Sequence, residues 1–325
     1  MENVKTSRVG ISPYTGLVSP AYIVLTNDAT DNRFFYYWFM FLYYNEVFNH
    51  LGGDGVRSAL NAKDLTALPI PSISTEEQCR RADYLDEKCS KIDAIIEKQQ
   101  LVIEKLKAYK LSVLNEAVAD IEGVSCHLGY ISMMKNGLNF NTVSDGKTVK
   151  FLGVGDFKDY FVLNNQDMFS EIILEETVPD DYLLHNGDIV FVRSNGSKEL
   201  VGRSIMVENV EFPLTYSGFC IRFRNIRTDI LNDKFLLYYF RSPYFRKQLE
   251  KYSQGSNISN INRDLLSRIT ITIPEMDVQL RAVEQLEKMN TRIDEIVGRK
   301  QAIIDKLTEY KKSLIYEVVT GKKDV

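Results

Sequence analysis

The stretch KIDAIIEKQQLVIEKLKAYKLSVLNEAV, from Lys91 to Val118, occurs a second time in the same chain in altered form. Its counterpart, RIDEIVGRKQAIIDKLTEYKKSLIYEVV, runs from Arg292 to Val319, and 12 of the 28 aligned positions are identical. The alignment has no gap, and the two copies lie 201 residues apart. A repeat of this kind predicts that one structural unit is used twice, so it decides the fold before any local pattern does.

The duplication extends upstream of these long charged segments. Ser19–Leu25 parallels Ser217–Phe223, and Gln78 parallels Gln279. In each copy the pattern predicts an apolar strand, an aromatic helix, a polar loop, a short strand that ends in proline, and a long helix. Residues 123–214 have no counterpart and show the pattern of strands and turns. We therefore expect an α+β fold of mixed strands and short helices, joined to two long helices.

Both long helices, expected from about Thr75 to Ala119 and from about Asp277 to Val319, carry apolar residues on a heptad. The first row of this seam, which has one polar position in each copy, comprises Leu85, Ile92, Gln99, Leu106 and Val113, then Leu286, Ile293, Lys300, Leu307 and Leu314. The second row lies three residues later and comprises Ile95, Val102 and Tyr109, then Met289, Ile296, Ile303 and Tyr310.

Neither long helix offers much apolar surface beyond this seam, so each needs a long partner. We expect the two copies to pair as an antiparallel coiled coil within one chain. A polar residue in a seam costs stability but can fix register and the choice of partner. The alternative is that each amphipathic helix packs on its own globular domain.

Composition excludes several classes of protein. The 325 residues have a formal net charge of −4, which gives no overall signal for nucleic-acid binding but allows local basic patches. The four cysteines show no CxxC spacing and no secretory context, which predicts a reducing cytoplasm rather than a disulfide or zinc framework. Phe34–Tyr44 is an apolar run about half as long as a membrane span, so it predicts a core helix.

Four motifs lie along the chain, and two of them occur in both copies of the repeat. Each long helix follows a strand-ending proline and a glutamine, and each carries Ile-Asp-x-Ile and then Leu-x-x-Tyr-Lys. The second copy ends with Val-Val-Thr-Gly-Lys at residues 318–322. Gly187–Ser197 has the sequence Gly-Asp-Ile-Val-Phe-Val-Arg-Ser-Asn-Gly-Ser and is followed by Leu-Val-Gly-Arg at 200–203. Together these motifs resemble the specificity subunit of type I restriction-modification systems.

The resemblance implies a DNA-recognition subunit with two target recognition domains, each followed by a long helix. The helices pair antiparallel as a ruler, and each domain recognises half of a bipartite site in double-stranded DNA. Two methyltransferase subunits, which hold S-adenosylmethionine, dock on this scaffold, and restriction subunits can join. The chain would then divide into part of a first recognition domain (1–74), a spacer helix (75–122), a second recognition domain (123–276) and a second spacer helix (277–325).

The first unit departs from the family pattern, because it keeps only the C-terminal part of a recognition domain. The aromatic helix at Phe34–Tyr44 then lacks the sheet that it should cover, and an exposed aromatic patch normally marks an interface. We expect a partner to cover it: a separate fragment that completes the domain, a second copy of the chain, or the methyltransferase subunit. The alternative is that the aromatic side chains fold back on the long helices.

Candidate DNA contacts follow the apolar strand at 188–192. Arg193, Ser194, Asn195, Ser197 and Lys198 offer a guanidinium fork, hydroxyls, an amide and an amine, and Arg203 lies shortly after them. This mixture suits phosphate clamping and contacts with base edges in the major groove. Asn195-Gly196 is equally typical of a hairpin turn.

Further candidates lie in other polar segments. Asn139 can contact adenine, and Lys135 and Lys158 can contact guanine or phosphate, with ordinary surface turns as the alternative. Backbone amides of a second loop can bind phosphate oxygens, with a helix cap as the alternative; the candidates are Gly255, Ser256, Asn257 and Asn260, and Arg57 and Ser58 in the equivalent loop. Arg222, Arg224 and Arg227 either extend a basic face or lie on a solvated strand.

Motifs for catalysis are missing from the sequence. It contains no Asn-Pro-Pro-aromatic or Asp-Pro-Pro-Tyr loop for base methylation, no P-loop and no GxSxG elbow. The three histidines show no metal-ligand spacing. We therefore predict a non-catalytic subunit without a metal or cofactor of its own. Two alternatives are a structural coiled-coil adaptor whose degenerate heads bind protein, and a fragment of a fused methyltransferase-nuclease.

Overall fold

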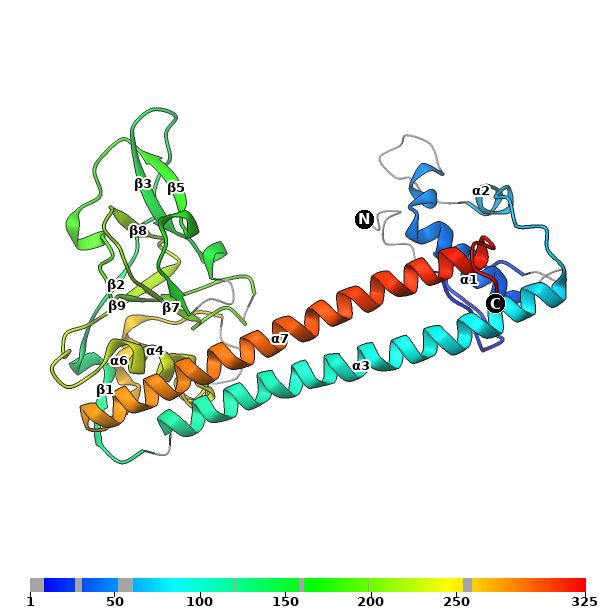
Figure 1. Ribbon diagram of the computed structural model, residues 1–325. Coiled ribbons are helices and arrows are strands. Elements are labelled where there is room, and N and C mark those ends of the chain that lie inside the picture. The colour runs from blue at the N-terminus through cyan, green and yellow to red at the C-terminus, as the bar shows by residue number, and fades with distance from the viewer. Residues whose placement is uncertain are drawn as a thin grey trace. The chain divides into compact units, whose positions relative to one another are not determined.

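The computed structural model describes residues 9–26, 31–51, 61–119, 121–157, 161–197, 199–253 and 259–325. The chain forms two compact units (Figure 1). Unit 1 comprises Met1–Lys105 with Glu295–Val325, and unit 2 comprises Leu106–Asp294. The two long helices, α3 (Thr75–Ala119) and α7 (Met276–Val319), contribute residues to both units. Their ends agree with the sequence prediction to within one residue.

Unit 2 contains three sheets. The five-stranded sheet has the order β2 (Ser132–Asn136), β9 (Cys220–Asn225), β6 (Ile189–Val192), β7 (Ser204–Val207) and β4 (Val162–Leu163). A three-stranded sheet has the order β5 (Ser170–Leu174), β3 (Lys147–Leu152) and β8 (Leu214–Tyr216), and β1 (Val124–His127) pairs with β10 (Thr270–Ile273). In the larger sheet all neighbours are antiparallel except β4 and β7, which are parallel.

Both faces of the five-stranded sheet are buried. On one face, Ile189 and Phe191 of β6 pack in a core with α4 (Asp233–Arg241), α5 (Pro243–Tyr252) and α6 (Arg263–Arg268), and with the ends of α3 and α7 that belong to unit 2. On the other face, Val190 and Val192 pack with residues of β3 and β8. Because side chains alternate along a strand, this double burial explains why β6 is a continuous apolar run.

In unit 1 the long helices pair antiparallel, as the sequence predicts (Figure 1). Lys311 Nζ lies 2.6 Å from a carboxylate oxygen of Asp93, and Lys300 Nζ donates to Gln99 Oε1 at 2.8 Å. Residues further along α3 thus pair with residues earlier in α7, as antiparallel packing requires. In unit 2, Lys110 Nζ lies 2.9 Å from Asp294 Oδ1.

These contacts follow the repeat. Under the offset of 201 residues, Asp93 corresponds to Asp294 and Lys110 to Lys311, so one ion pair is used twice with the helices exchanged. Gln99 and Lys300 correspond to each other, and they bond to each other. The alternative that each helix packs only on its own domain is therefore wrong.

Five of the seven residues in the second row of the predicted seam are wrong. Ile95, Val102, Tyr109, Ile303 and Tyr310 are exposed rather than packed between the helices, whereas Met289 packs against the core of unit 2. The residues that instead accompany the first row lie four positions after it, where Cys89, Ile103, Ile304 and Val318 are buried. Residues three and four positions apart lie on the same helix face. The heptad therefore predicts where the apolar stripe runs, but not which of its flanks packs against the other long helix.

The repeat also recurs as a set of side-chain bonds. Gln78 Oε1 accepts a hydrogen bond from the backbone N–H of Asp31, the N-cap of α1 (Asn32–Tyr44), at 2.8 Å. In the second copy Gln279 Oε1 accepts from the N–H of Asn232, the N-cap of α4, also at 2.8 Å. In both units a buried glutamine of the long helix therefore fixes the start of the aromatic helix.

The expected strands of the first copy are absent from the described residues. Residues 19–26 form a turn and irregular backbone, and the proline segment at 68–71 is also irregular. Their counterparts in unit 2 are β9 and β10, which pair with β2, β6 and β1. A strand needs a neighbour to satisfy its backbone groups, and the described part of unit 1 supplies none.

The aromatic helix α1 is covered within unit 1. Phe34 and Tyr37 are buried against the Leu85 and Ile92 side of α3 and against Leu314 of α7. On its other side, buried residues of α1 pack with Phe48 and with Leu65 of the short helix α2 (Ala62–Thr66). None of the residues from 34 to 44 is exposed, so the expected aromatic patch is wrong and the fold-back alternative is confirmed.

None of the described helices combines enough length with enough apolar character to cross a bilayer.

Replacing Gln279 by alanine should lower the free energy of unfolding by about 3 kcal/mol, because three buried backbone groups lose their partner. Gln279 is fully buried, and its Nε2 also donates to the carbonyls of Ile230 and Pro274, each at 2.8 Å. Denaturant unfolding measures the change. Gln301→Ala is the matched control, because that side chain is exposed and bonds to Asp305 on the helix surface. Equal effects of the two substitutions would contradict the structural role of Gln279.

Candidate nucleic-acid interface

One edge of the five-stranded sheet gathers three loops. β2 and β6 end at this edge, and β9 and β7 begin there, because the four strands are antiparallel neighbours. The loops at residues 137–139, 193–203 and 217–219 therefore meet, although they lie far apart in the sequence. Loops held by a rigid sheet are the usual place for binding residues.

A tight turn from Ser217 to Cys220 forms the middle of this edge. The N–H of Cys220 donates to the carbonyl of Ser217 at 2.8 Å. On one side the N–H of Gly218 donates to the carbonyl of Leu138 at 2.8 Å, and on the other the N–H of Arg193 donates to the carbonyl of Phe219 at 2.7 Å. Backbone hydrogen bonds thus join all three loops into one surface.

Two glycines allow this close approach. A Cβ atom at Gly137 would lie 2.2 Å from the carbonyl oxygen of Ser217, and one at Gly218 would lie 2.4 Å from Oδ1 of Asn139. At Gly137 this contact is with backbone, which leaves no room for a side chain, whereas at Gly218 it is with the end of the flexible Asn139 side chain. The Asn139 side chain therefore lies directly against the turn, on the exposed side of the loop.

Arg193 also lies against the turn. Among the described residues, the hydrogen bond of its guanidinium is a long one, 3.5 Å from Nη1 to the carbonyl oxygen of Gly218. Such a weak contact leaves most of the five N–H donors available. The carbonyl of Arg193 accepts from the N–H of Ile261 at 2.9 Å, and Ser194 forms a β-bridge with Asn260.

The structure thus brings together five predicted contact residues from three segments: Asn139, Arg193, Ser194, Asn195 and Asn260. Ser197 lies in the same loop, where its N–H donates to Asn195 Oδ1 at 2.8 Å. Asn195 is therefore also a turn residue, as its alternative predicts. Lys158, Lys198, Gly255, Ser256, Asn257, Arg57 and Ser58 lie outside the described residues.

Two other candidates are engaged within the fold. Lys135 Nζ lies 2.9 Å from Asp181 Oδ2 and 3.8 Å from the centre of the Tyr182 ring. This ammonium group lowers the pKa of the Asp181 carboxyl. Arg203 Nη1 donates to the carbonyl of Phe157 at 3.1 Å, so Arg203 ties the loop to the segment after β3.

The two arginines of β9 form hydrogen bonds inside the fold and do not make a basic surface. Arg222 is buried and donates to the carbonyl of Asp181 at 2.9 Å. Arg224 makes two bonds of 2.7 Å to the carboxylate of Asp188, which is itself buried and accepts from the N–H of His185. Both expectations for these two residues, the basic face and the solvated strand, are therefore wrong.

Sequence reasoning missed Phe219. This residue lies at the apex of the central turn, and its side chain is 54% exposed. A large apolar residue directly after a glycine, between two strands, is the signal that could have identified it. Its place beside Arg193 and Asn139 makes it part of the same surface.

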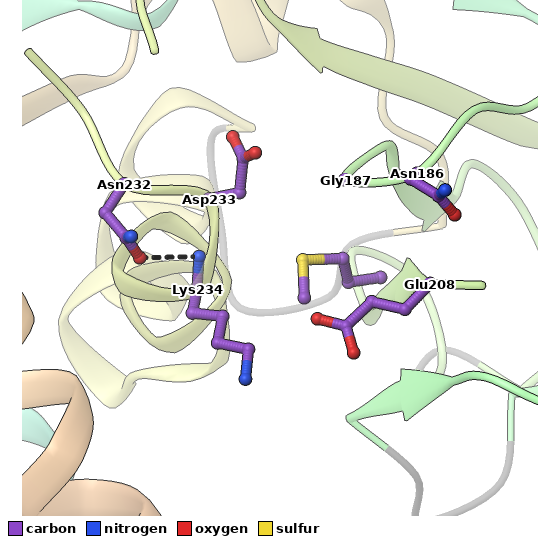
Figure 2. A pocket seen from close by; sticks show the side chains of 7 residues that line it. Asn186, Gly187, Glu208, Asn232, Asp233 and Lys234 are labelled. Atoms are coloured by element: carbon purple, nitrogen blue, oxygen red, sulfur yellow. Dashed lines mark hydrogen bonds between the residues drawn. The ribbon is translucent and has the colours of Figure 1, made fainter. Parts of the chain in front are cut away.

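A pocket of about 320 Å³ lies at the opposite edge of the same sheet (Figure 2). It is lined by Asn186, Gly187, Met206, Glu208, Asn232, Asp233 and Lys234. Figure 2 shows the Glu208 carboxylate and the Lys234 side chain pointing into the same space from facing elements. Lys234 is paired with Glu287 at 2.7 Å, and burial raises the pKa of the Asp233 carboxyl.

These carboxylates make the pocket a poor site for a phosphate backbone, so the loop surface is the better nucleic-acid candidate. The described residues also contain no group of three or more metal-ligating side chains that could hold an ion.

Residues 128–305 match the family model of the type I restriction modification DNA specificity domain. The chain is 25% identical over 301 residues to the specificity subunit of the type I restriction enzyme StySPI of Salmonella potsdam, which covers 86% of this chain and 63% of that one. The chain thus spans less than two thirds of the length of the curated relatives it matches.

The fold is similar to two solved structures. One is a chain of a type I R-M system studied for its complex assembly and conformational transition, with a TM-score of 0.70 at 15% identity, covering 89% of this chain and 71% of that one. The other is the HsdS subunit of Thermoanaerobacter tengcongensis, with a TM-score of 0.51 at 16% identity, covering 90% and 71%. At these identities the likeness concerns the fold alone.

Replacing Asp188 by alanine should destabilise unit 2 by about 3 kcal/mol, because it leaves the guanidinium of Arg224 without its buried counter-charge. Thermal or denaturant unfolding measures the loss. Asp229→Ala removes the partner of Arg227 in a solvent-exposed pair and should leave the unfolding curve unchanged. A wild-type unfolding curve for Asp188→Ala would show that the Arg224 pair does not hold the sheet together.

Proposed function

Because this chain belongs to the type I restriction modification DNA specificity family, we propose that it is the DNA-recognition subunit of a type I restriction-modification complex. In this role it recognises a sequence and leaves methylation and cleavage to other subunits. The loop surface formed by residues 137–139, 193–197, 217–219 and 260 is the part of unit 2 that contacts DNA.

The observation that carries this proposal is that hydrogen-bond donors from several loops lie together at one edge of the five-stranded sheet. Arg193 offers a guanidinium fork and Asn139 an amide, the two groups that form bidentate contacts with guanine and adenine. Ser194 and the backbone N–H groups of the loops are suited to phosphate oxygens. The backbone bonds between the loops hold these groups in place before binding, which lowers the entropic cost of recognition.

We further propose that the complete target is bipartite, with one half-site recognised by unit 2. The repeat supports this proposal, since the long helix, its glutamine and the aromatic helix occur in both units. Unit 1 is the candidate for the second half-site. Its predicted contact residues Arg57 and Ser58 lie outside the described residues.

Exposed apolar residues of the long helices support a scaffolding role. Val102 of α3 and its equivalent Ile303 of α7 are 36% and 43% exposed. Tyr109 and its equivalent Tyr310 are 57% and 54% exposed. Two equivalent apolar surfaces fit two copies of one partner, and we propose that these partners are the methyltransferase subunits, which hold S-adenosylmethionine.

Co-expression with a type I methyltransferase subunit tests the proposed function. The two should co-purify, and sequencing of methylated bases in the host should reveal one bipartite sequence modified on adenine. The chain alone should neither methylate nor cut DNA. Methyl transfer by the purified chain would favour the enzyme-fragment alternative, and a complex without salt-dependent DNA binding would favour the adaptor.

Replacing Arg193 by alanine in this complex should weaken binding by about 1–3 kcal/mol and relax specificity at one position, if the guanidinium contacts a base. If it clamps a phosphate, all sequences should bind more weakly and the salt slope should fall by about one unit. Binding titrations at several salt concentrations distinguish the two contacts. Arg227→Ala, near the opposite edge of the sheet, is the control. A folded Arg193→Ala complex that binds and modifies like wild type would reduce Arg193 to a turn residue.

A further inference from the structure

Phe219 combines exposure with a fixed position. Its side chain is 54% exposed, whereas its neighbours in the sequence, Gly218 and Cys220, are held in the turn and the core. Isolated exposed apolar residues are common on protein surfaces, so exposure alone carries no argument. The backbone around Phe219 and the side chains beside it carry the argument.

Four hydrogen bonds fix the turn that presents this side chain. Cys220 N–H to Ser217 carbonyl closes the turn, and the N–H of Phe219 itself donates to Ser217 Oγ at 3.2 Å. Gly218 is bonded to Leu138 and Phe219 to Arg193, one on each side. The phenyl ring therefore projects from a backbone that is already ordered, and an aromatic side chain loses little entropy on binding.

The two polar side chains beside Phe219, those of Arg193 and Asn139, offer hydrogen bonds but no apolar contact. The Arg193 guanidinium, beside the Gly218 carbonyl, matches the acceptors of guanine, and the Asn139 amide, against Gly218, matches adenine. Neither group can recognise the 5-methyl group of thymine, which no other base of DNA presents in the major groove. A phenyl ring is one of the side chains that makes this contact.

We propose that Phe219 is a specificity-determining residue that packs against the 5-methyl group of a thymine in the half-site recognised by unit 2. This inference rests on the proposed function, since it needs the loop surface to bind DNA. It adds one base position and one type of contact.

The test uses the full chain co-purified with its methyltransferase subunit and a pool of randomised DNA duplexes. In the sequence that is recovered, each thymine is replaced in turn by deoxyuridine, which lacks only the methyl group. One such replacement should weaken wild-type binding about fourfold, the value of one buried methyl group. Phe219→Ala should bind thymine DNA about tenfold more weakly and lose the difference between thymine and uracil.

Two controls accompany this substitution. Phe219→Leu keeps an apolar group and should retain part of the preference for thymine. Tyr130→Ala removes an aromatic residue that is 75% exposed just before β2, at the opposite edge of the sheet, and should change neither affinity nor preference. Because Phe219 is exposed, Phe219→Ala should unfold like wild type, and an unfolding curve verifies this.

The outcomes separate the two levels of inference. Failure of the wild-type complex to enrich any sequence would overturn the proposed function and this inference with it. Enrichment by wild type, with no thymine whose methyl group matters or with the same methyl dependence in Phe219→Ala, would overturn the role of Phe219 alone. A rise in 2-aminopurine fluorescence that depends on Phe219 but not on thymine methyl groups would show a wedge between base steps, and would also overturn it.

Discussion

The pairing of the two long helices is the constraint on which the rest of the structure depends. Each helix has one apolar stripe, and neither stripe can be buried without a long partner. The internal duplication supplies that partner from the same chain. In unit 1, Leu85 and Ile92 are buried with Leu314 and cover α1, and in unit 2 the ends of both helices complete the core beside the five-stranded sheet. The same seam therefore supplies part of the core of each unit.

The duplicated helices have diverged at the one position that faces its own equivalent. Gln99 and Lys300 occupy the same seam position, and Lys300 donates to Gln99 at 2.8 Å. Two copies of the first helix would place glutamine against glutamine, and two copies of the second would place lysine against lysine. Like charges in a seam repel, whereas a donor opposite an acceptor satisfies both groups. Divergence within one chain thus favours the pairing of unlike copies over the pairing of like ones.

Sequence patterns correctly predicted the features that follow from periodicity and repetition. They were less successful for features that depend on contacts with residues distant in the sequence. The extents of α3 and α7, their pairing and the first seam row follow from the repeat. The second row was wrong at Val102 and Ile303, because Ile103 and Ile304 are buried in their place. The loop at Arg193 was identified from its composition, but Lys135 and Arg222 are engaged by Asp181, which no local pattern indicates. The strand expected at Ser19–Leu25 failed because the described part of unit 1 offers no neighbouring strand.

The loop surface separates the bonds that build it from the side chains that it presents. Backbone groups of Leu138, Gly218, Phe219 and Arg193 make the bonds that join the loops. Substitution of residue 139, 193 or 219 by any residue except proline keeps those backbone groups, provided that Gly137 remains. The opposite holds in the sheet behind, where the side chains of Asp188 and Arg224 make the bonds themselves. Under the proposed function, this division allows the recognised sequence to change by substitution at the loop surface, while the fold that positions the loops is kept.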